Sequence, residues 1–261
     1  MRLIKTLAMP LFLALAGPAP AEESALKRMQ TADDSRGWEA VGRLDIAGRA
    51  FCTGALIAPD LVLTAAHCLY DRQSGERFDI ADMTFLAGWR NGRAEAYRAV
   101  RQALPHPGYE FAGADKVARV RHDIALIELA QPVRLSGVVP FQTEPRPRWG
   151  EEVGIVSYAH DRAEAPSIQE VCDILGRQPG VLVTSCLVDF GSSGAPIFVM
   201  RDGVARIVSV VSAKAELGDK PVALGSTLGN ALADLRAMVG RNPVVPAGQR
   251  LSAGGAKFLR P

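Results

Sequence analysis

Short runs of alternating apolar and polar residues recur along most of the chain, with turn-forming residues between them. Each run has the length of a strand, and no helical period connects them. The clearest runs are residues 39–46, 50–57, 61–65, 82–89, 95–103, 124–129, 152–158, 195–200 and 204–213. Many short strands separated by turns are typical of barrels and sandwiches, so the sequence predicts an all-β protein.

Two segments interrupt this strand pattern. Residues 131–150 carry four prolines and little periodicity, which indicates a connector between two halves of the chain. Residues 230–240 are the one good helix candidate, because Asn230 can cap its start and Gly240 can end it. Residues 241–261 follow as a loosely held tail.

The first residues have the pattern of an export signal. Arg2 and Lys5 precede an apolar run at residues 6–16, and residues 19–21 form a small-x-small cleavage site. The apolar run is too short to span a bilayer. The alternative to an export signal is a buried first helix. Cleavage after Ala21 would remove residues 1–21, so we expect an exported chain, periplasmic or extracellular, with no membrane attachment afterwards.

Charge argues against one class of partner. Without Arg2 and Lys5, the 30 Lys and Arg residues fall to 28, equal to the 28 Asp and Glu residues. No long basic run is present, so the sequence does not favour nucleic-acid binding.

Export makes disulfide bonds the expected state of the four cysteines. Cys52, Cys68, Cys172 and Cys186 allow three pairings. We favour 52–68 with 172–186, because these are the two shorter closures. Their spacing fits no zinc signature, and we expect no metal site.

Three separate stretches carry residues that could act together. His67 ends the stretch 52–68, Asp123 precedes the apolar strand 124–129, and two serines lie between glycines in "DFGSSGAPIF" at 189–198. A serine hydroxyl is a weak nucleophile that needs a base, and histidine is suited to that task. A buried carboxylate would orient the histidine, and backbone N–H groups beside a glycine could stabilise an oxyanion.

These stretches resemble the three catalytic-site motifs of the trypsin/chymotrypsin-like serine proteases. "LTAAHC" (63–68), "HDIALIEL" (122–129) and "GSSGAP" (191–196) occur in the family's order. The resemblance covers about residues 37–240 and lies nearest the bacterial glutamyl endopeptidase-like enzymes. It implies two six-stranded antiparallel β-barrels, at about 37–130 and 151–229, with a C-terminal helix.

The resemblance also implies a role for each matching residue. His67 would be the general base and acid, Asp123 would orient it, and Ser193 would be the nucleophile. The N–H groups of Gly191 and Ser193 would form the oxyanion hole. The disulfide Cys52–Cys68 would brace the histidine loop.

Further roles concern substrate binding. Ser209 would lie near the triad, and the backbone of Ser209, Val210 and Val211 would pair with the substrate as an added strand. Counting back from Ser193 places the pocket base near Leu187, with Val188 beside it. Neither is acidic, and Val211 would narrow the pocket, which favours small or medium apolar side chains before the scissile bond.

The chain departs from the family at the residue before the nucleophile. Trypsin-like enzymes carry an Asp there that pairs with a new N-terminal amine after zymogen cleavage, whereas this chain has Ser192. Activation by insertion of the terminus is therefore not expected. Residues 22–36 could still be a pro-segment, because Lys27 and Arg28 form a dibasic cleavage site.

The sequence thus predicts a monomeric, exported serine endopeptidase that acts on proteins or peptides and needs no cofactor. Two alternatives stay open. The chain could be a homologue that has lost activity and acts as a binding protein. Reactivity of Ser193 toward a phosphonate would distinguish an active protease from such a homologue. A non-peptide hydrolase, such as an esterase, could use the same triad, and a substrate screen would distinguish it.

Overall fold

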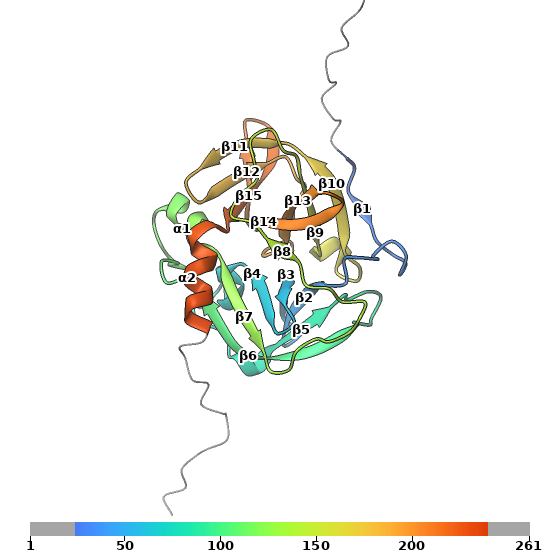
Figure 1. Cartoon of the computed structure of the whole chain (residues 1–261). Helices are drawn as coiled ribbons and strands as arrows, with labels where there is room; N and C mark the ends of the chain where they lie inside the picture. The colour runs from blue at the N-terminus through green and yellow to red at the C-terminus, as the bar shows by residue number, and fades with distance from the viewer. Residues whose placement is uncertain (1–23, 240–261) are drawn as a thin grey trace, which may run out of the picture.

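The structure is a computed structural model that describes residues 24–239. Its strands form a closed six-stranded barrel and a separate nine-stranded sheet. Figure 1 shows the two units side by side, the second sheet above the barrel. The prediction of an all-β fold with a C-terminal helix is confirmed. Of the two predicted six-stranded barrels, the first is closed, whereas the second unit is a nine-stranded sheet. Because the predicted signal (1–21) and tail (241–261) lie outside the described residues, those two predictions stay untested.

The barrel is built from the first half of the chain, in the order β2-β3-β4-β7-β6-β5. Its strands are β2 (Val41–Ile46), β3 (Ala50–Ala58), β4 (Leu61–Thr64), β5 (Met83–Ala87), β6 (Ala96–Pro105) and β7 (Ala125–Leu129). Every neighbouring pair is antiparallel. Apolar side chains such as Leu44, Phe85 and Leu126 fill the interior, as the alternating pattern requires.

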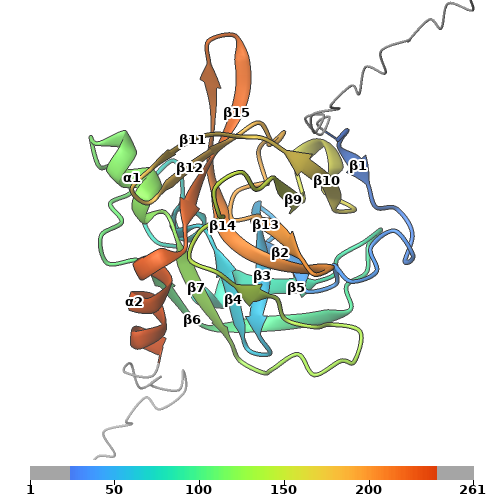
Figure 2. The same cartoon turned by 45° about the horizontal axis from the view of Figure 1, so that its top comes forward.

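The second sheet follows the path β1-β10-β9-β13-β14-β15-β12-β11, with β8 pairing in parallel with β14. Its strands are β1 (Lys27–Arg28), β8 (Gln142–Thr143), β9 (Val153–Ser157), β10 (Ser167–Cys172), β11 (Ile174–Gln178), β12 (Val181–Thr184), β13 (Pro196–Arg201), β14 (Val204–Leu217) and β15 (Lys220–Thr227). The path from β10 to β12 contains six strands, and β1, β8 and β11 extend it. Figure 2 shows the β14–β15 hairpin projecting beyond the rest of this sheet.

Two α-helices lie against the strands. The helix α1 (Lys116–His122) begins after Asp115, whose side chain accepts hydrogen bonds from the N–H groups of Val117 and Ala118. The helix α2 (Gly229–Val239) packs against β6 and β7. Because α2 begins at Gly229, Asn230 lies inside its first turn and does not cap it, contrary to the sequence analysis. Gly240 lies outside the described residues.

The predicted connector, residues 131–150, runs from the barrel to the second sheet and contributes only β8. The strand pattern of the sequence did not predict β1, β8, β10, β11, β12, β15 or α1. The strands β11 and β15 begin or end in exposed residues with weak alternation, so burial gave them no strong pattern. Within residues 24–239, no helix is long and apolar enough to cross a membrane.

The two units share a hydrophobic interface. The larger core cluster joins barrel residues to Val156, Tyr158, Phe198 and Ile207 of the second unit. A close-packed apolar interface resists relative motion of the two units, so groups on its two sides can hold a fixed geometry.

Candidate active site

His67 and Asp123 are brought together at one end of the barrel. His67 lies in the short 3-10 helix η1 (Ala66–Leu69), directly after β4, and Asp123 lies between α1 and β7. Because β4 and β7 are neighbours in the barrel, the two residues meet at the same edge. The Nδ1 atom of His67 is 2.6 Å from Oδ2 of Asp123. This contact leaves Nε2 of His67 free to face a reacting group.

The Asp123 carboxylate is almost fully buried, at 3% exposure, and is held by three donors. Its Oδ1 accepts from the His67 backbone N–H at 2.8 Å. Its Oδ2 accepts from the Ser212 hydroxyl at 2.5 Å, besides the contact with His67. Buried carboxylates are costly unless hydrogen-bonded, so these three contacts compensate the burial and fix the orientation of the side chain.

The backbone at Asp123 is also supported from the second sheet. The hydroxyl of Ser226, on β15, lies 2.5 Å from the Val120 carbonyl and 3.0 Å from the Asp123 carbonyl. The second unit therefore holds the aspartate from two strands, through Ser212 on β14 and Ser226 on β15.

Ser193 lies in the loop between β12 and β13, and its flanking glycines are required by close packing. Gly191 has φ +96° and Gly194 has φ +75°, values that favour glycine. A Cβ atom at Gly194 would collide with Thr64 Oγ1 and the Thr53 carbonyl. A Cβ at Gly191 would collide with the ring of Phe51. The glycines thus let the loop approach the barrel beside His67.

Thr53, on β3, ties this loop to the barrel. Its N–H donates to the Ser193 carbonyl at 2.9 Å, and its hydroxyl donates to the Gly191 carbonyl at 2.8 Å. These bonds orient the peptide units of the loop with their carbonyls toward the barrel. Within residues 24–239, the N–H groups of Gly191 and Ser193 donate to no other protein atom. Two free N–H groups beside a nucleophile can stabilise an oxyanion.

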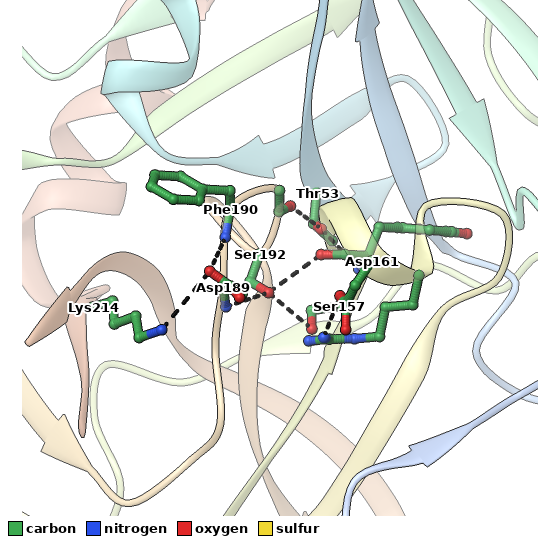
Figure 3. A network of polar contacts seen from close by, with 10 residues as sticks. Thr53, Ser157, Asp161, Asp189, Phe190, Ser192 and Lys214 are labelled. Carbon is green, nitrogen blue, oxygen red and sulfur yellow. Dashed lines mark hydrogen bonds and ion pairs between the residues drawn. The ribbon is translucent and has the colours of Figure 1, made fainter. Parts of the chain in front are cut away.

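Ser192 is fully buried and belongs to a polar network, shown in Figure 3. Its Oγ lies 3.3 Å from Ser157 Oγ and 3.2 Å from the Tyr158 carbonyl. It also accepts from the Asp189 N–H at 3.3 Å. The side chain therefore points away from the cleft and holds the loop against the end of β9. This leaves Ser193 as the serine of the pair that faces the cleft.

Ser193, His67 and Asp123 line one cavity of about 820 Å³. His67 and Ser193 also line a second hollow of about 690 Å³, so the cleft extends to both sides of this pair. The first cavity carries Arg72, Arg119, Lys214, Asp189 and Glu216 on its walls. Lys214 Nζ lies 3.8 Å from Asp189 Oδ1, which places an exposed ion pair at the cleft (Figure 3).

A phenol close to the cleft is kept in its neutral form. Burial, with the negative charge of Asp123 adding to it, raises the pKa of Tyr109 well above its ordinary value. Tyr109 lines the same cavity as His67 and remains protonated over the usual working range of pH.

The serine of β14 that contacts Asp123 is not the one expected from the sequence. Ser209 is buried and its hydroxyl donates to the Ser226 carbonyl at 2.8 Å, so it does not reach Asp123. Ser212, which the sequence analysis missed, takes that position. A register shift in β14 between Val211 and Ala213 separates the two serines, and no residue pattern signals it.

The backbone of residues 209–211 is already paired on both sides. Ser209 and Val210 lie opposite β13 and β15, and the Val211 N–H and carbonyl bond to Ala195 and Gly194. Beyond Val211 the strand pairs with β15 alone, and Ser212, Ala213 and Lys214 line the cavity. The free edge therefore begins at Ser212. The expected pairing of substrate with Ser209, Val210 and Val211 is wrong, because their backbone groups are already bonded within the fold.

Only some of the residues expected to form the specificity pocket line the cavity. Val188 and Val211 line the cavity. Among the residues that the structure describes, the cavity lining does not include Leu187, whose side chain is on the surface at 43% exposure. The Leu187 N–H donates to Gln169 Oε1 at 2.8 Å, and Cys186 beside it is bonded to Cys172. These contacts hold residue 187 against β10, away from the pocket base.

Both favoured disulfides are present, Cys52–Cys68 and Cys172–Cys186. The first joins β3 to η1 and so fixes the segment that carries His67. Cys52, His67 and Cys68 also cluster closely enough to suggest a metal site. Their sulfur atoms are bonded to each other, so they offer no thiolate to a metal ion.

The geometry can be compared with known proteins. The sequence model of the Trypsin family matches residues 29–176, a range that holds His67 and Asp123 and ends before Ser193. The chain belongs to the trypsin family. Kallikrein-15 of Saguinus oedipus is 35% identical over 134 residues, 50% of this chain and 46% of that protein. Glutamyl endopeptidase of Bacillus licheniformis is 27% identical over 148 residues, 56% of this chain and 45% of that protein.

The chain thus spans less than half the length of these two trypsin-family relatives. A solved structure of a Glu endopeptidase in complex with MPD has a TM-score of 0.66 and 17% identity to this chain. It covers 83% of this chain and 97% of its own. At that identity the likeness concerns the fold, which agrees with the barrel and second sheet described above.

Proposed function

We propose that this member of the trypsin family is an exported serine endopeptidase. The observation that carries the proposal is the arrangement of His67 on Asp123 at 2.6 Å, with Ser193 lining the same cavity. Ser193 attacks the carbonyl carbon of the scissile bond while His67 takes the hydroxyl proton. His67 then returns a proton to the leaving amine, and water hydrolyses the acyl-enzyme by the same steps.

The remaining groups support the two charges that develop. Asp123 stabilises the imidazolium form of His67, and the N–H groups of Gly191 and Ser193 receive the oxyanion. The free edge of β14 from Ser212 onward would pair with an extended substrate. The substrate is a protein or peptide, and the two disulfides favour a periplasmic or extracellular location.

The pocket before the scissile bond would take small or medium apolar side chains. Val188 and Val211 line the cavity, and both are branched apolar residues. Lys214 and Asp189 compensate each other's charge. A peptide library should therefore show cleavage after small apolar residues. A strong preference for Arg, Lys or Glu would overturn this part of the proposal.

The decisive experiment is intact-mass analysis after incubation with a fluorophosphonate. We expect one adduct on the wild-type protein and none on Ser193→Ala. Ser192→Ala tests which serine is labelled: its hydroxyl is buried and points away from the cleft, so the variant should still form the adduct, although more slowly, because the loop loses the contacts with Ser157 and Tyr158. Absence of an adduct on folded, fully oxidised wild-type protein would instead support a binding protein without catalytic activity.

A further inference from the structure

The N-terminal segment Ser24–Gln30 is bound to the second sheet as part of the fold. Its strand β1 lies along the edge of β10 (Figure 1). Lys27 pairs with Ile168 and Arg28 with Ser167. The Met29 N–H donates to the Pro166 carbonyl at 2.9 Å. The Met29 side chain is buried in the core at 1% exposure.

Ser24, the first residue that the structure describes, is held by several hydrogen bonds to β10. Its N–H donates to the Val171 carbonyl at 3.1 Å, and its hydroxyl accepts from the Val171 N–H at 2.8 Å. Its carbonyl accepts from Gln169 Nε2 at 3.0 Å. Ser24 therefore contacts two residues of β10, Gln169 and Val171.

Gln169 connects this segment to the loop that carries Ser193. Its side chain is buried at 2% exposure, and its Oε1 accepts from the Leu187 N–H at 2.8 Å. One amide group thus spans from the Ser24 carbonyl to the Leu187 backbone. Leu187 is the residue at which the chain leaves the Cys172–Cys186 disulfide and enters the nucleophile loop.

The other anchors of this loop lie further along it. Ser192 binds at the end of β9, and Thr53 holds the carbonyls of Gly191 and Ser193. The first anchor, at Leu187, depends on Gln169, and the orientation of Gln169 depends on Ser24. Without the segment, the buried Nε2 group of Gln169 would lose its partner, which is costly for a buried donor.

We propose that Ser24–Gln30 is a permanent positioning strap for the nucleophile loop and acts through Gln169. The proposal rests on the endopeptidase function proposed above. It assigns Gln169 as a positioning residue and makes cleavage at Lys27–Arg28 an inactivating event. A removable pro-segment would have the opposite effect, because its loss would raise activity.

The test uses the chain beginning at Glu22 and the variant Gln169→Met, which keeps the side-chain volume but removes both amide contacts. We expect the rate constant for fluorophosphonate labelling to fall by about tenfold, as the loss of one or two hydrogen bonds predicts. In peptide hydrolysis, kcat should fall while KM changes little, because the loop geometry acts on the transition state. Hydrogen exchange at the Leu187 amide should become faster by about the same factor.

Two further variants separate positioning from general stability. Met83→Ala removes a buried side chain of β5, a strand that pairs with β2 and β6 and with neither segment. It should lower Tm without changing the labelling rate. The exchange rate at Leu187, measured relative to global unfolding, should also stay unchanged. Ser24→Ala keeps the carbonyl that Gln169 needs and loses only the hydroxyl contacts with Val171. It should therefore show a smaller effect than Gln169→Met, in the same direction.

A truncated chain beginning at Met29 gives the sharpest contrast. We expect it to label slowly and to regain its rate when a peptide of the missing residues 22–28 is added, because an edge strand can bind in trans. The strap is disproved if the truncated chain labels faster, or if Gln169→Met labels and exchanges at wild-type rates. If the wild-type protein forms no adduct, the proposed function fails, and exchange at Leu187 alone then decides whether the strap exists.

Discussion

The barrel and the second sheet position their parts of the site in different ways. In the barrel, His67 and Asp123 follow or precede neighbouring strands, and the disulfide Cys52–Cys68 lies beside the histidine. In the second unit, the loop carrying Ser193 is held by separate polar contacts with Gln169, Ser157, Tyr158 and Thr53. Neighbouring strands bring the proposed acid–base pair together, with further hydrogen bonds to Asp123 from Ser212 and Ser226. The loop of the proposed nucleophile has no such strand neighbours beside it and is held mainly by remote hydrogen bonds.

This difference has an energetic consequence. A residue at the end of a closed barrel strand is held by the whole ladder, so single changes nearby move it little. A loop held by a few hydrogen bonds depends on each of them, because one such bond contributes about 1 kcal/mol. We therefore expect activity to be more sensitive than stability to changes around the nucleophile loop.

The largest effect should come from the barrel's own acid–base pair. Asp123→Asn keeps the shape of the side chain but presents an amide to His67 Nδ1, which favours the wrong tautomer. We expect kcat to fall by a factor on the order of 10⁴. Steady-state kinetics on a peptide ester or anilide measures this, with circular dichroism as the check on folding. A loss below about tenfold would show that Asp123 does not orient the base.

The two disulfides should separate stability from activity. Their closures span 16 and 14 residues, so removing either pair should lower the free energy of unfolding by about 3 kcal/mol. Denaturant unfolding of Cys52→Ala/Cys68→Ala and Cys172→Ala/Cys186→Ala compares them directly. Below the unfolding range, the second variant should label more slowly with fluorophosphonate, because Cys186 begins the nucleophile loop. Equal labelling rates would contradict the comparison.

The two serines of β14 test the register of that strand. Ser212→Ala removes the hydroxyl that donates to Asp123, and we expect kcat/KM to fall by about tenfold. Ser209→Ala removes a hydroxyl that binds the Ser226 carbonyl, so it should change kcat/KM by less than about threefold. Parallel kinetics on the two variants decide between the two registers. A larger loss for Ser209→Ala would restore the placement that the sequence suggested.

The smallest effect concerns the histidine that joins the barrel to α2. Burial, with a smaller contribution from stacked His122, lowers the pKa of His106, although Asp234 opposes the shift. Because the unfolded chain then binds a proton more readily, the stability contribution is present above the unfolded pKa and is lost as pH falls below it. The free energy of unfolding should decrease from about pH 7 to about pH 5, and less so in His106→Gln. Urea unfolding at several pH values in that range measures this dependence for both proteins. If the free energy of unfolding changes with pH equally in both, His106 does not contribute to the pH dependence.

Much of the site could be predicted because its motifs are local. The stretch 63–68 places His67 after a strand, and the stretch 191–196 supplies two glycines whose positive φ values the nucleophile loop requires. The disulfide pairing also followed from short closures along the chain. The proposed roles of His67, Asp123 and Ser193 still await the labelling experiment.

What the sequence determined by itself was therefore the strand pattern, the all-β class and the motif residues, because these depend on neighbours along the chain. The tertiary structure alone decided that Ser212 and not Ser209 reaches Asp123, and that Leu187 lies outside the pocket. It also decided that Ser24 contacts Gln169. These contacts join residues that are 89, 145 and 18 positions apart for Ser212–Asp123, Gln169–Ser24 and Leu187–Gln169. A strand bulge or a buried amide can redirect such contacts without leaving a periodic signal in the sequence.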